Sequence, residues 1–316
     1  MDLSRGVILA LGGNSISPKG ATGTIEQQWD HTEETMAEIA DLWVKHRWPL
    51  VLTHGNGPQV GRILLRGELA AAELDPLPLD VAVADSQAGI GYMIQHILSN
   101  HLIRRGMEFN TVTLVTRVEV REDDPGFANP TKPIGRFHTP EEAEVRMRER
   151  GWLMIDDAGR GWRRVVASPK PLRIVEIGAI AHLLQRGDIV IAAGGGGIPV
   201  FKQPDNTMKW CECVIDKDLA SALLAQELGI PCLVIITAVP RVCLDWGKET
   251  QREVDHLTAD EAREHLEAGQ FPAGSMGPKI EAAVLFAESG GTTVIAQSGE
   301  LEAALEGRAG TRIVPS

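Results

Sequence analysis

The sequence predicts an α/β protein whose largely parallel sheet is covered by helices on both faces. Six short apolar runs recur along the chain, and segments with helical spacing of apolar residues separate them. Continuous apolar runs are typical of strands buried on both faces, as in parallel sheets. The predicted strands cover residues 7–11, 50–53, 112–115, 189–193, 232–237 and 293–296.

Helices are predicted between these strands from apolar residues spaced three and four apart. The apolar stripe of the first helix consists of Met36, Ile39, Ala40, Trp43 and Val44, and that of another consists of Ile90, Met93, Ile94, Ile97 and Leu98. Later in the chain, Thr258 and Glu261 form a capping box, which predicts a short helix that Gly269 ends.

Composition narrows the class of partner. The 316 residues are enough for one large domain or two modest ones, and the net charge is −12. No basic tract is present, so we expect neither nucleic acid nor an anionic membrane as a partner. The four cysteines lack zinc spacing and are interpreted as reduced structural thiols. Without a signal-peptide pattern or an 18-residue apolar run, we expect a cytoplasmic protein.

One region interrupts the alternation of strands and helices. Residues 121–172 are rich in proline and glycine, carry many charges and show little periodicity. Long insertions in compact domains are usually lids or binding loops. We therefore expect residues 121–172 to form an inserted lid subdomain over the site.

The start of a helix at residues 214–225 carries three consecutive charges. Asp216 and Asp218 suit the positive end of a helix, whereas Lys217 gains nothing from the helix dipole there. An anion bound at the helix end explains Lys217. The alternative is a solvated lysine flanked by two capping aspartates, which is the better interpretation of an isolated Asp-Lys-Asp.

A similar arrangement occurs near the end of the chain. Lys279 follows a glycine-rich turn, and Pro278 suits the first position of the helix that comes next. The apolar stripe of that helix is Ile280, Ala283, Val284 and Ala287. Two lysines at helix starts predict a polyanionic ligand held between two helix ends.

Glycine-rich loops follow three of the predicted strands, at residues 11–14, 53–58 and 193–199. Ligands bind at the carboxyl ends of parallel strands, and glycine lets backbone amides approach phosphate oxygens closely. Each loop alone is more often a simple turn, but together with the two lysines they favour phosphate. The P-loop, the dinucleotide fingerprint and the serine nucleophile motif are absent, and His54 is interpreted as holding its loop in shape.

Several longer motifs resemble the carbamate kinases of the amino acid kinase superfamily over almost the whole chain. They are ALGGN at residues 10–14, THGNGPQVG at 53–61, PTKPIG at 130–135, SPKPLRIVE at 168–176, VIDKDLA at 214–220 and AGSMGPK at 273–279. The resemblance implies a single domain over residues 1–316, a three-layer sandwich with a central, mainly parallel eight-stranded sheet, and a nucleotide-binding half at 189–316. It also implies a homodimer and reversible phosphoryl transfer between ATP and carbamate with Mg²⁺.

The resemblance assigns roles to individual residues. Lys217 and Lys279 bind the phosphoryl group, Asp218 and Asp216 orient those lysines, and Lys132 reaches carbamoyl phosphate from the lid. The substrate-binding residues that it implies are Gly12, Gly13, Asn14, Gly55, Asn56 and Gly57. The nucleotide-binding residues are Gly195, Gly196, Lys217, Thr237, Ser275, Met276 and Lys279. No residue is assigned to hold a metal directly.

The chain departs from the family pattern after residue 237. Ala238 stands where the family commonly has an aspartate, and Pro240 and Arg241 alter the same wall of the expected nucleotide pocket. Trp246 offers an aromatic face to adenine or is part of the core. The leading hypothesis is a carbamate kinase that makes ATP from ADP and carbamoyl phosphate in nitrogen catabolism. The alternatives are a kinase of the same fold for another small acid and a non-catalytic sensor of carbamoyl phosphate or nucleotide.

Overall fold

The central sheet lies between two layers of helices. The computed structural model describes residues 3–13, 16, 24–157, 159, 161–272 and 274–316. Within them, the largest sheet has eight strands. In spatial order these are β15 (His256–Thr258), β17 (Thr311–Val314), β16 (Thr292–Gln297), β12 (Cys232–Thr237), β1 (Val7–Leu11), β2 (Leu50–His54), β9 (Ile189–Ile191) and β3 (Thr111–Thr113). Only the β16–β17 pair is antiparallel, which confirms the mainly parallel sheet.

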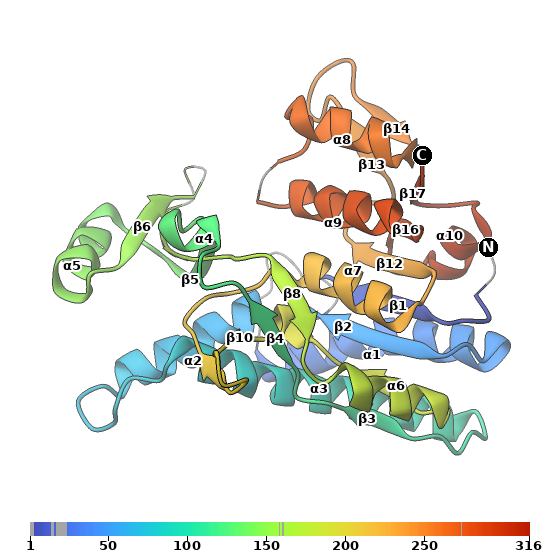
Figure 1. Ribbon diagram of the computed structural model, residues 1–316, viewed down its shortest axis with the longest axis horizontal. Helices are drawn as coiled ribbons and strands as arrows, with labels where there is room; N and C mark the ends of the chain where they lie inside the picture. Colours follow the sequence, from blue (N-terminus) through green and yellow to red (C-terminus); the bar gives the residue numbers. More distant parts are fainter. Residues whose placement is uncertain (1–2, 14–15, 17–23, 158, 160, 273) are drawn as a thin grey trace.

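Strand β1 shows why both faces are covered. Val7, Leu9 and Leu11 pack into one core, and Ile8 and Ala10 pack into the other, because side chains alternate along a strand. The first core is closed by α1 (Ile25–His46), α3 (Leu79–Arg104) and α10 (Leu301–Glu306). The second is closed by α6 (Ile177–Gln185), α7 (Lys217–Leu228), α8 (Ala259–Glu267) and α9 (Met276–Glu288). These layers form the predicted three-layer sandwich (Figure 1).

The predicted elements are largely confirmed. All six predicted strands lie in the main sheet as β1, β2, β3, β9, β12 and β16, with ends that shift by at most two residues. The capping box of Thr258 and Glu261 is formed at the start of α8, and Gly269 follows the helix with a positive φ of 70°. The helix with Lys279, however, begins at Met276, so Pro278 is its third residue and not its first.

Residues 121–172 contain more regular structure than the sequence predicts. Here β5 (Lys132–His138), β7 (Trp162–Val166) and β6 (Leu153–Asp156) form a small antiparallel sheet with α5 (Pro140–Arg150). The prolines suggested an irregular chain, but Pro140 opens α5 behind a capping box of Thr139 and Glu142. Figure 1 shows α5 and β6 at one end of the molecule, away from the main sheet.

The remaining elements lie outside the main sheet and outside the small sheet of the insertion. A four-stranded sheet contains β11 (Met208–Trp210), β10 (Ile198–Lys202), β4 (Arg117–Val120) and β8 (Pro171–Ile174). The other elements are α2 (Gly57–Leu69), α4 (Pro125–Ala128), the 3₁₀ turn η2 (Gly194–Gly196), β13 (Val242–Leu244) and β14 (Arg252–Val254).

In the part of the chain that the structure describes, no helix has the length and apolar character needed to cross a membrane.

Candidate active site

Helix α7 begins at the carboxyl end of the central strands and carries the charged triplet in its first turn. Asp216 is the N-cap residue, and its Oδ1 accepts a hydrogen bond from the backbone N–H of Asp218 at 2.8 Å. Ala220, Leu224 and Ala225 anchor the helix in the core, while Leu219 and Leu223 are only half-buried. The predicted cap is confirmed, and the core fixes the direction in which the triplet points.

Asp218 joins the two lysines that the sequence singles out. One of its carboxylate oxygens pairs with Lys217, and the other accepts a hydrogen bond from Lys279 Nζ at 2.8 Å. The Asp218 side chain is only 4% exposed, and those of Lys217 and Lys279 are 12% and 15% exposed. The first turns of α7 and α9 therefore meet at a single buried carboxylate.

Lys132 reaches the same place from the inserted subdomain. It is the first residue of β5, and its Nζ lies 2.6 Å from Asp216 Oδ2. Three ammonium groups thus gather around two carboxylates at the start of α7, which leaves one positive charge without an opposite partner within the group. Such a cluster attracts a small anion.

Burial and neighbouring charges have opposing effects on the pKa values of the side chains in this cluster. Burial by itself would raise the pKa of the Asp218 carboxyl, but the adjacent Lys217 and Lys279 outweigh it and hold that pKa well below its usual range. Burial also lowers the pKa of Lys217, a change that Asp218 partly offsets and Lys279 reinforces. A further negative charge near Lys217 would favour its ammonium form.

This geometry corrects one argument from the sequence. We expected Lys217 to lack a favourable partner until an anion binds, or else to be solvated between two capping aspartates. Instead it is largely buried and paired with Asp218. The helix-dipole argument did not foresee this contact because neighbouring residues in a helix normally point in different directions, whereas the family resemblance assigned Asp218 to orient Lys217. At the first turn, however, the flexible lysine side chain bends back to its neighbour.

The glycine loops enclose the lysine cluster. A Cβ on Gly12 would lie 2.5 Å from the carbonyl oxygen of Ile236, and one on Gly55 would lie 3.6 Å from both the Gly13 amide nitrogen and Lys217 Cδ. The loops after β1 and β2 are therefore adjacent to each other and to Lys217. Gly57 is the first residue of α2, and Asn14 lies outside the described residues.

The third glycine loop lies on the other side of Asp216. Gly195 and Gly196 are buried, with positive φ angles of 67° and 96°. A side chain at Gly195 would collide with Asn56, and one at Gly196 would collide with the backbone at Ile215 and Asp216. These two positions require glycine because the backbone is left-handed and another chain segment passes directly above it.

Buried polar residues that the sequence analysis did not assign support these loops. Gln87 in α3 donates to the carbonyl oxygens of Thr116 and Gly194 and accepts from the Thr116 amide. Asn56 donates to Ser86 Oγ at 2.8 Å. Ser86 and Gln87 are adjacent to a segment with helical periodicity, and only their burial, at 2% exposure each, distinguishes them from surface residues.

The remaining predicted nucleotide residues lie at the end of β12 and at the start of α9. Thr237 ends β12 beside Gly12, Ser275 is the exposed N-cap residue of α9, and Met276 begins that helix. Ala238 is exposed, and Trp246 is 58% exposed, so the interpretation of Trp246 as a core residue is wrong.

His54 is buried next to the cluster. Its Nδ1 lies 3.1 Å from the carbonyl oxygen of Gly55, and its ring contacts Gly194. Burial lowers the pKa of His54 to about 4, so the ring is neutral at pH 7. The contact with Gly55 lies within the loop that His54 was predicted to hold in shape, and the contact with Gly194 joins this loop to a second glycine loop.

Comparison with known proteins agrees with this geometry. Residues 5–297 match the model of the amino acid kinase family. A carbamate kinase of Pyrococcus furiosus is 44% identical over 99% of this chain and all of its own length. The carbamate kinase-like protein YahI of Escherichia coli is 46% identical over 98% of each chain. The structure of Giardia lamblia carbamate kinase bound to AMP-PNP superimposes with a TM-score of 0.91 at 39% identity over 98% of each chain. The chain belongs to the amino acid kinase family, within its carbamate kinase group.

Proposed function

We propose that this chain is a carbamate kinase that transfers a phosphoryl group between carbamoyl phosphate and ADP in the cytoplasm, within nitrogen catabolism. The observation that carries the proposal is the convergence of Lys132, Lys217 and Lys279 on Asp216 and Asp218 beneath the glycine loops. A cluster of this kind neutralises an anion without supplying a nucleophile. Phosphoryl transfer needs that combination.

The reaction requires charge stabilisation more than proton transfer. A β-phosphate oxygen of ADP attacks phosphorus, the bond from phosphorus to the carbamoyl oxygen breaks, and carbamate leaves with the electron pair. Carbamoyl phosphate dianion and ADP trianion become carbamate monoanion and ATP tetraanion, so no proton is gained or lost. A general base is therefore unnecessary, which agrees with a neutral, buried His54.

We assign the residues as follows. Lys217 and Lys279 stabilise the transferring group, Asp218 orients both, and Lys132, held by Asp216, faces carbamoyl phosphate. The amides of Gly12, Gly13, Gly55 and Gly57, with Asn56, line the carbamoyl phosphate side, and the family resemblance adds Asn14 to this set. The nucleotide phosphates are bound by Gly195, Gly196, Ser275 and Met276, with Thr237 beside them.

Mg²⁺ binds to this enzyme together with the nucleotide substrate. Among the described residues, no group of three acidic, histidine or cysteine side chains is placed to hold a metal. Mg²⁺ keeps several waters and binds largely through substrate phosphates, so such a group is not required. We further propose that residues 189–316 form the nucleotide-binding half, that residues 121–172 close over the site, and that the enzyme is a homodimer.

The first prediction is direct. Purified protein supplied with ADP, Mg²⁺ and carbamoyl phosphate produces ATP in a coupled assay, and omission of any one of the three abolishes the signal. Lys132→Met, which keeps the side-chain length but removes the charge, serves as the low-activity control. Binding of both substrates without ATP formation would contradict the proposal.

A kinase of the same fold that acts on another small acid is the alternative to a carbamate kinase. Ala238 and Pro240 are exposed in the expected nucleotide wall, so they bear on nucleotide binding and not on the choice of acid. The same assay with acetyl phosphate distinguishes the two: a carbamate kinase uses carbamoyl phosphate much faster than acetyl phosphate.

A further inference from the structure

The inserted subdomain is fixed to the body at two places along α2. Near the site, an apolar cluster joins them through Val60 and Ile63 of α2, Ile134 of β5, Val166 of β7 and Val214. In the same stretch, a Cβ on Gly61 would lie 2.9 Å from the Gly135 Cα, so α2 and β5 are in direct backbone contact. Strand β5 therefore runs along α2, with Lys132 at the end nearest the active site.

A charged cluster lies at the end of the α2–β5 contact that is farther from the active site. Glu68, in the last turn of α2, forms an ion pair with Arg146 of α5 at 3.2 Å, and the two side chains are only 15% and 25% exposed. The guanidinium carbons of Arg146 and Arg164 lie 5.6 and 4.8 Å from the centre of the Trp152 ring. Glu68 also attracts the Arg164 guanidinium, although Glu212 does so more strongly.

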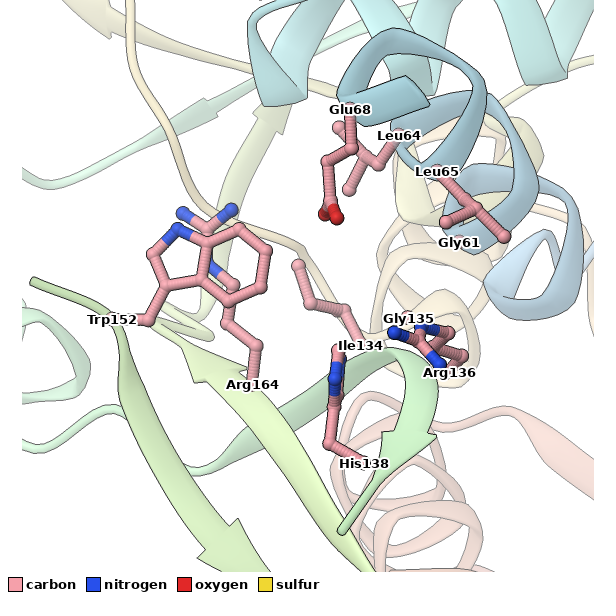
Figure 2. A pocket seen from close by; sticks show the side chains of 10 residues that line it. All are labelled: Gly61, Leu64, Leu65, Glu68, Ile134, Gly135, Arg136, His138, Trp152 and Arg164. Carbon is pink, nitrogen blue, oxygen red and sulfur yellow. The ribbon is translucent and has the colours of Figure 1, made fainter. Parts of the chain in front are cut away.

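A cavity of about 20 Å³ separates these groups, which is enough room for a water molecule. Figure 2 shows Glu68 pointing from α2 toward Arg164 and Trp152, with Ile134 and His138 of β5 on the opposite side. The insertion and α2 thus meet here through partly buried charges and a small void beside apolar side chains, whereas the cluster of Val60 and Val166 is formed by packed apolar side chains.

We propose that Glu68 and Arg146 are positioning residues for Lys132: their ion pair fixes the inserted subdomain against α2 and thereby holds Lys132 beside Asp216. The proposal rests on the catalytic role proposed for Lys132. Strand β5 transmits the effect because it begins at Lys132 and pairs with β7 up to Ile134, which lies opposite Arg164, before the register shifts toward His138. A partly buried ion pair sets orientation more than it adds stability.

The test uses the full chain and four variants: Glu68→Gln, Arg146→Gln, the double variant, and Glu149→Gln as a control. Glu149 also lies on α5 and pairs with an arginine, but its side chain is 61% exposed. Amide hydrogen exchange of β5 is measured without substrate. We expect exchange about tenfold faster in each single variant, no further increase in the double variant, and the parent rate in Glu149→Gln.

Steady-state kinetics provide the second readout. In Glu68→Gln and Arg146→Gln, the KM for carbamoyl phosphate rises about five- to tenfold, while the KM for ADP stays within twofold. Unchanged β5 exchange, effects that add in the double variant, or equal changes in both KM values would overturn the proposal. The exchange measurement needs no catalysis, so a parent protein that makes no ATP would refute the proposed function without refuting the ion pair's role.

Discussion

At the scale of single residues, His54 has a structural role although histidine is often a catalytic residue. It is 1% exposed, bridges two glycine loops and stays neutral at pH 7. The sequence indicated this role only by the absence of a serine or cysteine nucleophile motif nearby. Its burial supplies the physical reason, because a desolvated imidazole resists protonation.

The second prediction concerns the pH dependence of stability. The unfolded chain protonates His54 near its usual pKa of 6.5, but the folded chain does so only near 4. The unfolded state therefore binds more protons between these values, and stability falls as the pH drops from 6.5 to 4. His54 accounts for about 2.5 kcal/mol of this loss at pH 4.5.

Urea unfolding of the parent and of His54→Asn between pH 7 and 4.5 measures the contribution of His54 to the free energy of unfolding. As the pH falls, the free energy of unfolding decreases less in the variant than in the parent. His138 still contributes a smaller decrease in both proteins, because burial lowers its pKa as well. Parallel curves for the two proteins would show that His54 is not the group responsible.

At the scale of elements, the loop after β1 contains two adjacent glycines with different reasons for being glycine. Gly12 passes under β12, where a Cβ would collide with the Ile236 carbonyl oxygen, whereas a Cβ on Gly13 would meet nothing within 4 Å. Gly12 is thus required by packing. Gly13 is free to serve a ligand.

The third prediction separates these two roles. Gly12→Ala lowers the free energy of unfolding by about 2–4 kcal/mol, since the backbone of β1 or β12 must shift. Gly13→Ala stays within about 0.5 kcal/mol of the parent but raises the KM for carbamoyl phosphate. Unfolding curves and kinetics on the same preparations check both statements. Equal destabilisation by the two variants would contradict the loop geometry.

At the scale of the whole molecule, local patterns predicted the central sheet well. Six of its strands are continuous apolar runs, and the capping box marks α8 correctly. The strands β15 and β17 were missed because exposed or half-buried residues alternate with buried ones in both, so neither contains a continuous apolar run. The small sheet of the insertion was also missed, because its strands are half-exposed and its prolines resemble breakers.

The site residues were predicted, and the family resemblance also assigned Asp216 and Asp218 to orient Lys217 and Lys279, but the partner of Lys132 was not predicted. The helix starts and glycine loops marked Lys217, Lys279 and the nearby amides. The contact of Lys132 with Asp216 joins residues 84 positions apart, and that of Lys279 with Asp218 joins residues 61 apart. Such pairings depend on how the insertion and α9 pack, which periodicity alone does not determine.

The central claim is that this long-range cluster exists to stabilise a phosphoryl group, and Lys217→Met tests it most directly. Burial already disfavours the Lys217 charge in the folded protein, and Asp218 keeps Lys279 as a partner. We therefore expect the melting temperature without ligand to stay within roughly 4 °C of the parent. The rate of ATP formation should fall on the order of a hundredfold to a thousandfold, and Asp218→Asn should also lose rate. A Lys217→Met protein that melts far lower while keeping most of its activity would show that Lys217 is a structural partner of Asp218, and the account would be wrong.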